Sequence, residues 1–165
     1  LIIFVPKFDY IQGRIFSFFN RETGTHNFQS DKAIESITSG GFFGKGIGEG
    51  VLKNRVPEAH TDYIISVISE EFGVVAIMLI LLLFLILIYM VFKKISFETN
   101  DKAKLILIGS ISLILMQATI HVGVNIRLFP TTGMTLPFLS YGGSSIISTS
   151  VLGGIILNLT KRKIT

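Results

Sequence analysis

Cysteine is absent from this 165-residue sequence, and charge is absent from several long stretches of it. Without cysteine, these residues can form neither a disulfide framework nor a metal site built on thiolates. The first long uncharged stretch, from Val74 to Phe92, runs for 19 consecutive residues without Lys, Arg, Asp or Glu. A helix of that length spans roughly 29 Å at ~1.5 Å per residue, which is close to the hydrocarbon thickness of a bilayer. The sequence therefore indicates a membrane protein.

The composition supports that class, because 49% of the residues are hydrophobic and the mean hydropathy is +0.63. A soluble fold of this size needs more polar surface. Two further apolar stretches, residues 105–126 and 140–159, are predicted to span the membrane, and a buried helix of a soluble protein is the alternative for each stretch. The predicted fold class is all-α: a polytopic membrane protein fragment with three transmembrane helices (about 74–92, 105–126 and 140–159) and a long external loop.

The distribution of lysine and arginine predicts the orientation of these spans. The segment before residue 74 carries seven basic and nine acidic residues. The connector between the first two spans and the C-terminal tail are instead rich in basic residues: Lys93, Lys94, Lys102 and Lys104 in the connector, and Lys161, Arg162 and Lys163 in the tail. Basic residues near the ends of spans favour the cytoplasmic side. We therefore expect residues 93–104 and the C-terminus in the cytoplasm, with residues 6–73 and 127–139 outside. The net charge of +4 then reflects membrane topology, and no nucleic-acid partner is expected.

The first residues, "LIIFVPKF", resemble the last turns of an apolar segment, and they are too short for the core of a signal peptide. We expect a C-terminal part of a longer protein. Residues 1–5 would end a preceding span, residues 6–73 would form the external loop, and residues 74–165 would hold the last three transmembrane helices.

Two neighbouring motifs lie in the first half of the external loop. "SDKAIESITSG", residues 30–40, predicts a short helix that Ser30 caps and Gly40 ends. "GGFFGKGIGEG", residues 40–50, holds six glycines in eleven residues. It is not a P-loop, because Gly46 rather than Ser or Thr follows Lys45. Two interpretations stay open: a flexible loop, or a loop that bends around a bulky ligand or lipid headgroup with Lys45 on its phosphates.

A third motif, "PEAHTDYIISVISEEFG" at residues 57–73, places four carboxylates directly before the uncharged span. A helix starting at Pro57 would align Glu58, Asp62, Ser66 and Glu70 in one stripe. Thr61 or Asp62 could instead cap a helix that starts slightly later. An unbroken helix to residue 92 would measure about 54 Å, so we expect a bend near Gly73. The acids form either a solvated face, or a general base or divalent-cation site.

Polar residues also occur in and between the last two spans. Gln117, His121 and Asn125 recur every fourth residue, which predicts either hydrogen bonds between helices or contacts with substrate. Ser145, Thr149 and Gly153 have the spacing of a close-packed helix face. The connector "LFPTTGMTLPFLSYGGSS", residues 128–145, is rich in proline and glycine, and irregular backbone near a membrane must line a cavity or be covered by protein.

Three motifs together resemble one family. "SGGFFGKGIGEG", "PEAHTDYIISVISEEFG" and "FPTTGMTLPFLSYGGSS" occur in this order with spans between them, and the resemblance covers about residues 12–163. The sequence thereby resembles the SEDS family (shape, elongation, division and sporulation; the FtsW/RodA/SpoVE-like proteins), and its division branch more than its elongation branch. This resemblance implies ten transmembrane helices, of which these spans are the last three.

The resemblance also implies a function. Members polymerise lipid II into glycan strands and release undecaprenyl pyrophosphate, with an essential external acid that matches Asp62 as general base. No tightly bound cofactor is implied, although a divalent cation (Mg²⁺ or Mn²⁺) near the pyrophosphate is compatible with the family's chemistry, with its ligands unknown. The residues that the motifs place near the substrate are Lys45, Glu58, His60, Thr61, Glu70, Glu71, Ser140, Gly142 and Gly143.

Implied partners are lipid II, membrane lipids, a class B penicillin-binding transpeptidase and other division proteins, at the septum of the bacterial cytoplasmic (inner) membrane. The isolated fragment is expected to be inactive, because the helices before it are missing. Two alternatives stay open. One is a lipid II flippase that uses the polar row Gln117–His121–Asn125, and the other is a non-catalytic scaffold for the transpeptidase.

Overall fold

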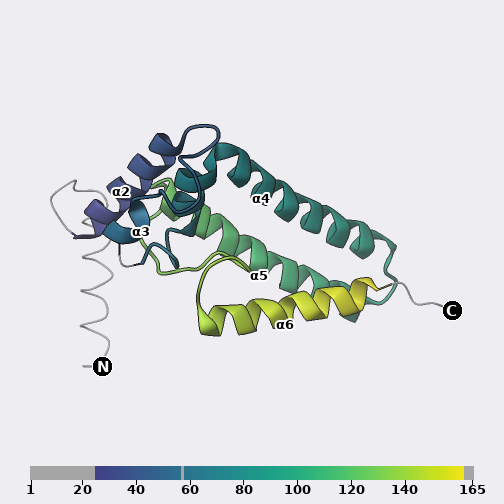
Figure 1. The fold of residues 1–165 in the computed structure, drawn as a ribbon. Coiled ribbons are helices and arrows are strands. Elements are labelled where there is room, and N and C mark those ends of the chain that lie inside the picture. Colours follow the sequence, from purple (N-terminus) through teal and green to yellow (C-terminus); the bar gives the residue numbers. More distant parts are fainter. Residues whose placement is uncertain (1–24, 57, 162–165) are drawn as a thin grey trace, which may run out of the picture.

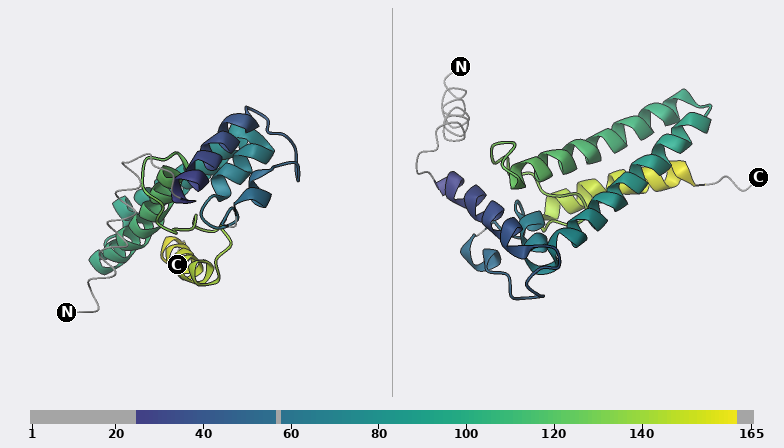
Figure 2. Two further views of the ribbon diagram at one scale, coloured as in Figure 1. Left: turned by 90° about the vertical axis from the view of Figure 1, so that its left-hand side faces the viewer. Right: turned by 90° about the horizontal axis from the view of Figure 1, so that it is seen from above.

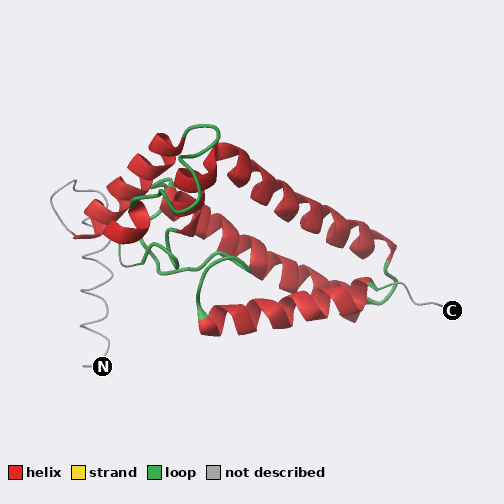
Figure 3. Cartoon of the chain, in the orientation of Figure 1, coloured by secondary structure: helices red, strands yellow, loops and turns green. Residues whose placement is uncertain are grey.

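The computed structural model describes residues 25–56 and 58–161 of the chain. Within them the chain forms helices and loops and no strand, which confirms the all-α fold class (Figure 3). The helices, labelled in Figure 1, are α2 (Thr25–Gly40), α3 (Leu52–Arg55), α4 (Ile64–Phe97), α5 (Asp101–Asn125) and α6 (Gly143–Thr160). The predicted end of a preceding span at residues 1–5 lies outside the described residues, and so does Pro57.

Three helices are long and apolar enough to cross a membrane: α4, α5 and α6. Most side chains in the apolar part of α4 are exposed, as expected where lipid rather than protein surrounds a helix. The predicted boundaries are wrong by a few residues at two places. The second span starts four residues earlier, at Asp101, because Asn100 accepts a hydrogen bond from the backbone of Lys102 and caps the helix.

The bend expected near Gly73 is confirmed. Gly73 has φ 79° and ψ −177°, which breaks the helical backbone inside α4. A methyl group on Gly73 would lie 2.2 Å from the carbonyl oxygen of Phe42, so only glycine fits there. The nine residues before Gly73 therefore form an outer segment of α4, and the apolar membrane-spanning part starts at Val74.

At its outer end the molecule has a small core of its own. α2 lies along the outer segment of α4, as Figure 1 and both views of Figure 2 show. The core joins α2, α3, the turn before α4, α4 itself and α5 through buried apolar side chains: Ala33, Leu52, Val56, Ala59, Tyr63, Val67 and Val124. This core holds the segments before α4 together and places them over the ends of α4 and α5.

The predicted N-cap of the first helix is wrong. α2 begins at Thr25, so Ser30 lies inside the helix rather than at its start. Ser30 is buried, and its hydroxyl lies 3.4 Å from the Tyr63 hydroxyl. Packing against Tyr63 therefore explains this serine, whereas the predicted end of the helix at Gly40 is confirmed.

Candidate functional site

Residues 58–63, which hold the motif "EAHTDY", form consecutive turns rather than the predicted helix. The backbone N–H groups of Thr61 and Asp62 both donate to the carbonyl of Glu58, at 3.2 and 3.0 Å. Helix α4 then starts at Ile64, with Tyr63 at its N-cap and no side-chain cap. Both predictions for this start are therefore wrong: residues 58–63 are not helical, and the N-cap residue is Tyr63 rather than Thr61 or Asp62.

The reason lies in residues distant in sequence, which bond three successive carbonyl groups of this turn. The His60 carbonyl accepts from the Tyr141 backbone N–H at 3.1 Å. The Thr61 carbonyl accepts from the Ser140 hydroxyl at 2.8 Å, and the Asp62 carbonyl accepts from the Asn125 amide at 2.9 Å. Three tertiary hydrogen bonds thus hold the turn in place and override its local helical preference.

Asn125 is the centre of this arrangement. Its side chain is fully buried, and the amide nitrogen donates to the carbonyls of Asp62 and His121, both at 2.9 Å. The amide oxygen accepts from the Ser66 hydroxyl at 2.7 Å and from the Ser66 backbone N–H at 3.2 Å. The amide therefore makes two donor and two acceptor bonds, which satisfies its hydrogen-bonding capacity and fixes the end of α5 to the start of α4.

The other two residues of the polar row hold the connector between α5 and α6. Nδ1 of His121 lies 2.8 Å from the Met134 carbonyl, and because a carbonyl only accepts, Nδ1 carries the hydrogen. The Gln117 amide donates to the Thr135 carbonyl at 2.9 Å and to the Ser145 hydroxyl at 3.2 Å. Of the two interpretations of the row, these bonds favour contacts between helices and the connector.

The connector brings its own polar side chain to the site. The Ser140 hydroxyl accepts from the Leu136 backbone N–H at 2.8 Å while it donates to the turn, so it joins the two segments. Ser140 therefore precedes α6, which starts at Gly143 instead of the predicted residue 140. Arg127 and Phe138, at either end of the connector, have positive φ angles of 59° and 65°, a conformation that costs free energy in residues other than glycine.

The side chain of Asp62 extends from the turn toward this connector. A methyl group on Gly133 would be 3.8 Å from Oδ2 of Asp62, so the carboxylate faces the connector near Gly133. Asp62 and Thr61 are partly buried, whereas Glu58 and His60 are exposed to solvent. The turn therefore presents one partly buried carboxylate, and hydrogen bonds from Asn125 and Ser140 fix the backbone that carries it.

Glu70 belongs to a different cluster, and the solvated acidic stripe predicted for it is wrong. The side chain is 2% exposed. One oxygen accepts from the Lys45 ammonium at 2.9 Å and the other from the Leu52 backbone N–H at 2.9 Å. Burial raises the pKa of Glu70, but the bonds from Leu52 and Lys45 outweigh it, so the pKa lies below its ordinary value. Lys45 thus contacts a carboxylate of its own chain.

The glycine-rich segment wraps around the break in α4. The backbone N–H groups of Lys45 and Gly46 donate to the carbonyls of Glu70 and Glu71, at 2.8 and 3.1 Å. A methyl group on Gly44 would lie 2.2 Å from the Glu71 carbonyl oxygen. The glycines therefore allow close contact with a helix of the same chain, which differs from both interpretations offered by the sequence.

The remaining candidates lie at the start of α6. Gly142 is the N-cap residue, and a methyl group there would be 3.2 Å from the Thr135 side chain. Gly143 has open space around it. The sequence motifs placed Ser140, Gly142 and Gly143 together and put Ser66 in a polar stripe with Asp62, yet they did not mark Tyr141. No local signal predicts the bond between Ser66 and Asn125, because the two residues are 59 positions apart.

The described part of the chain holds no group of three or more His, Asp or Glu side chains arranged to bind a metal ion. The divalent cation expected from the family resemblance stays a prediction.

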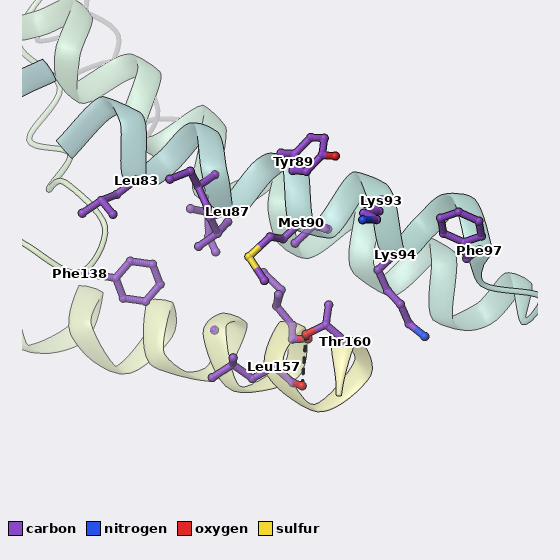
Figure 4. Close-up of a pocket in the computed structure, with 15 residues that line it drawn as sticks. Leu83, Leu87, Tyr89, Met90, Lys93, Lys94, Phe97, Phe138, Leu157 and Thr160 are labelled. Carbon is purple, nitrogen blue, oxygen red and sulfur yellow. Dashed lines mark hydrogen bonds between the residues drawn. The ribbon is translucent and has the colours of Figure 1, made fainter. Parts of the chain in front are cut away.

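A large, mainly apolar cavity lies elsewhere. It measures about 790 Å³ and separates α4 from α6, with a mainly apolar lining and Lys93 and Lys94 at its far end (Figure 4). Phe138 points into it from the connector, with its ring 3.4 Å from the position of a methyl group on Gly153. Leu83, the first α4 residue that lines the cavity, follows the break at Gly73 by ten residues, about 15 Å along the helix. The α4 side of the cavity therefore lies along the span and away from the turn.

Comparison with known proteins gives a consistent result. A family model described as "Cell cycle protein" and named for FtsW, RodA and SpoVE matches residues 1–164. The chain is 40% identical over 138 residues to the probable peptidoglycan glycosyltransferase FtsW of Enterococcus hirae, covering 83% of this chain and 35% of the relative. It is 38% identical over 158 residues to the protein of that name from Caulobacter vibrioides, covering 94% of this chain and 40% of the relative. It is 36% identical over 165 residues to the protein of that name from Geobacter metallireducens, covering 98% of this chain and 44% of the relative. The chain thus spans less than half the length of these relatives.

Proposed function

Because the chain belongs to the family of cell cycle proteins named for FtsW, RodA and SpoVE, we propose that it forms the catalytic end of a peptidoglycan glycosyltransferase of cell division. The substrate is lipid II, which the whole protein polymerises into glycan strands. The similar proteins carry the name probable peptidoglycan glycosyltransferase FtsW, and the three apolar helices fit a multi-pass membrane protein.

In this proposal Asp62 is the general base. The 4-hydroxyl of the acceptor N-acetylglucosamine attacks C1 of the lipid-linked N-acetylmuramic acid, and Asp62 takes the proton of that hydroxyl. The bond from C1 to the diphosphate oxygen breaks, inversion occurs at C1, and undecaprenyl pyrophosphate leaves. No step is assigned to a metal ion, and participation of Mg²⁺ or Mn²⁺ remains a prediction.

One observation carries the proposal: Asp62 is a partly buried carboxylate in a turn that both α5 and the connector hold in place. Asn125 and Ser140 hold the backbone of the turn from two different elements. A base must be held in one place to act on one hydroxyl, because misplacement by about 1 Å can cost on the order of 100-fold in rate. Glu58 is exposed and Glu70 is neutralised by Lys45, which makes both weaker candidates.

The test uses the full-length protein with its transpeptidase partner and purified lipid II. Asp62→Asn should reduce glycan polymerisation by at least about 100-fold, since general-base catalysis contributes roughly 10²–10⁴. Glu58→Gln, in the same turn but exposed, is the matched control and should retain activity within about threefold. Normal polymerisation by Asp62→Asn would rule out Asp62 as the base.

The flippase alternative has less support. A polar path through the membrane needs side chains free to meet the headgroup, yet Gln117, His121 and Asn125 bond to the connector, to Ser66 and to the turn. Lipid II transfer across liposomes by the Asp62→Asn protein would support that activity separately. If the protein is only a scaffold, it makes no polymer even before substitution. Asp62→Asn would then leave recruitment of the transpeptidase unchanged and would cause no loss of polymer.

The remaining parts of the proposal concern the surroundings. The partners would be a class B penicillin-binding transpeptidase and other division proteins, in the cytoplasmic membrane at the septum. Residues 25–73 and 127–142 would face outward. One finding supports a common side for these two segments: they pack together at one end of the long helices, away from the 98–100 turn (Figure 1).

A further inference from the structure

We propose that the glycine-rich loop inserts its tip into the outer lipid leaflet. The tip consists of Phe42, Phe43 and Ile47. The occupant of this surface is then the interfacial region of the bilayer, and the loop anchors the external segments at a fixed depth. This inference is independent of the role of Asp62.

In the part of the chain that the structure describes, the tip presents strongly exposed apolar side chains outside the long helices. Phe42, Phe43 and Ile47 have 76%, 86% and 80% of their surface exposed. Lys45 is the only charged residue from Gly41 to Gly48, and its ammonium group is turned toward Glu70. Contiguous exposed apolar side chains indicate contact with a membrane or another protein.

Hydrogen bonds fix the depth of the tip. The backbone N–H of Val74 donates to the Gly41 carbonyl at 3.0 Å, and that of Val75 donates to the Phe42 carbonyl at 3.4 Å. Val74 and Val75 are the first two residues of the uncharged span. Phe42 therefore lies at the level where the span begins. The loop that follows α2 runs beside the start of the long part of α4 in Figure 1.

The length of that span then places the tip at a membrane boundary. The charges at the other end of the span begin at Lys93, and the 19 residues between Val74 and Phe92 cover roughly 29 Å, about one hydrocarbon thickness. With Lys93 and Lys94 at one interface, Val74 and the loop bonded to it lie at the other. Aromatic side chains are enriched at this depth, where a ring meets both lipid and headgroups.

The loop is also built to hold this position. The Gly44 N–H donates to the Gly40 carbonyl at 2.8 Å, and the Lys45 N–H donates to the Glu70 carbonyl at 2.8 Å. The backbone on either side of the phenylalanines is thus bonded to α2 and α4. Beside the tip, Phe72 and Val75 are exposed as well, at 44% and 52%. The apolar surface of the tip therefore continues into that of the span.

Tryptophan fluorescence can test this directly, because the 165 residues contain no tryptophan. Phe43→Trp is introduced into the full-length protein in nanodiscs, and the emission of the unsubstituted protein is subtracted. Lipids brominated near the headgroup should quench this tryptophan by at least half, and more than lipids brominated deep in the chain. Ile47→Trp serves as a second probe at the tip with the same expectation.

Two control positions calibrate the result. Leu82 is exposed in the middle of the span, so Leu82→Trp should be quenched more by lipid brominated deep in the chain than by lipid brominated near the headgroup. Asn54 is exposed on α3, so Asn54→Trp should be quenched by neither lipid. The proposal is overturned if both tip probes respond to aqueous acrylamide as strongly as Asn54→Trp and ignore brominated lipid. It is also overturned if both are protected from acrylamide and bromine alike, since protein then covers the tip.

Discussion

A single buried amide links the proposed base to the membrane helices. Asn125 is held in α5, and its nitrogen donates to the carbonyl of Asp62 while its oxygen accepts twice from Ser66. Residues that act on a catalytic group through its backbone are seldom visible in a sequence. The spacing of Gln117, His121 and Asn125 predicted either hydrogen bonds between helices or contacts with substrate, but nothing in that spacing identified Asp62 as the partner.

Asn125→Asp should separate positioning from folding. The substitution keeps an oxygen for Ser66 but loses the donor to Asp62, whose carbonyl then faces a carboxylate. We expect kcat for polymerisation to fall about 10- to 100-fold because the base is displaced, with KM for lipid II within about threefold. The acidic limb of the pH–rate profile should also move, which a purely structural defect would not cause.

Thr119→Ala, an exposed position on the same helix, is the control and should change neither parameter. Asn125→Ala should in addition lower the free energy of unfolding by about 2–3 kcal/mol, because the Ser66 and Asp62 groups lose their partner while buried. A drop in activity that only parallels the loss of folded protein, with an unchanged pH profile, would contradict the positioning role.

Glu70 gives the outer segment a pH dependence with a definite sign. Its pKa is lowered on folding, so its stabilising contribution is present above the unfolded pKa of about 4.3 and is lost as pH falls through the folded value. Glu70→Gln should therefore lower the unfolding temperature at pH 5–7, by the equivalent of about 1–3 kcal/mol. Below about pH 4 the difference from wild type should shrink.

Thermal unfolding of the purified full-length protein between pH 3 and 7 measures this difference. Glu49→Gln, an exposed acid in the glycine-rich segment, is the control and should follow wild type throughout. If the difference in unfolding temperature between wild type and Glu70→Gln widens as the pH falls, the predicted direction of the pH dependence is wrong.

At the scale of elements, the glycine-rich segment and the break in α4 form one unit. The loop carries backbone donors to the carbonyls before Gly73 and backbone acceptors for the N–H groups after it. These are the groups that a helix leaves unpaired where its backbone is interrupted. The break is therefore stabilised by an external strap of the same chain.

Gly44→Ala should disrupt this unit. Gly44 has φ +77°, and the added methyl group would lie 2.2 Å from the Glu71 carbonyl oxygen, so both conformation and contact are unfavourable. We expect a loss of about 2–4 kcal/mol in the free energy of unfolding, measured by chemical denaturation in mild detergent. Gly154→Ala, in α6 with open space around it, is the matched control and should be neutral or slightly stabilising.

The elements also show what a sequence can predict. The three spans follow from long apolar runs, and the bend at Gly73 follows from a length that exceeds the bilayer. The turn at residues 58–63 could not be predicted, because its three carbonyl partners lie 63 to 81 residues further along the chain. Glu70 looked like a surface acid for the same reason, since Lys45 and Leu52 come from other segments.

At the scale of the whole molecule, the two ends of the long helices differ in kind. One end holds a folded unit with its own core, and the other holds the short connection at residues 98–100 and the end of α6. Basic residues outnumber acidic ones around the second end, whereas acidic residues outnumber basic ones before residue 74. The positive-inside rule then predicts that the folded unit is outside the cell.

Single-cysteine labelling of a cysteine-free full-length protein tests this orientation. Thr132→Cys, in the connector, should react with a membrane-impermeant maleimide in intact spheroplasts. Asn100→Cys should react only after the membrane is opened. Both positions are exposed to solvent in the structure, so burial would not explain a difference between them. The reverse pattern of labelling would invert the topology and remove Asp62 from the external face.

The bond between Asn125 and Asp62 also sets an order of events during biosynthesis. The ribosome makes residue 62 before residue 125, and Ser140 and Tyr141 emerge later still. A nascent chain that has exported its acidic turn therefore lacks all three partners of that turn until α5 and the following connector have passed through the translocon. In the proposed enzyme, precursor consumption would then begin only after the connector that holds Ser140 and Tyr141 has been exported.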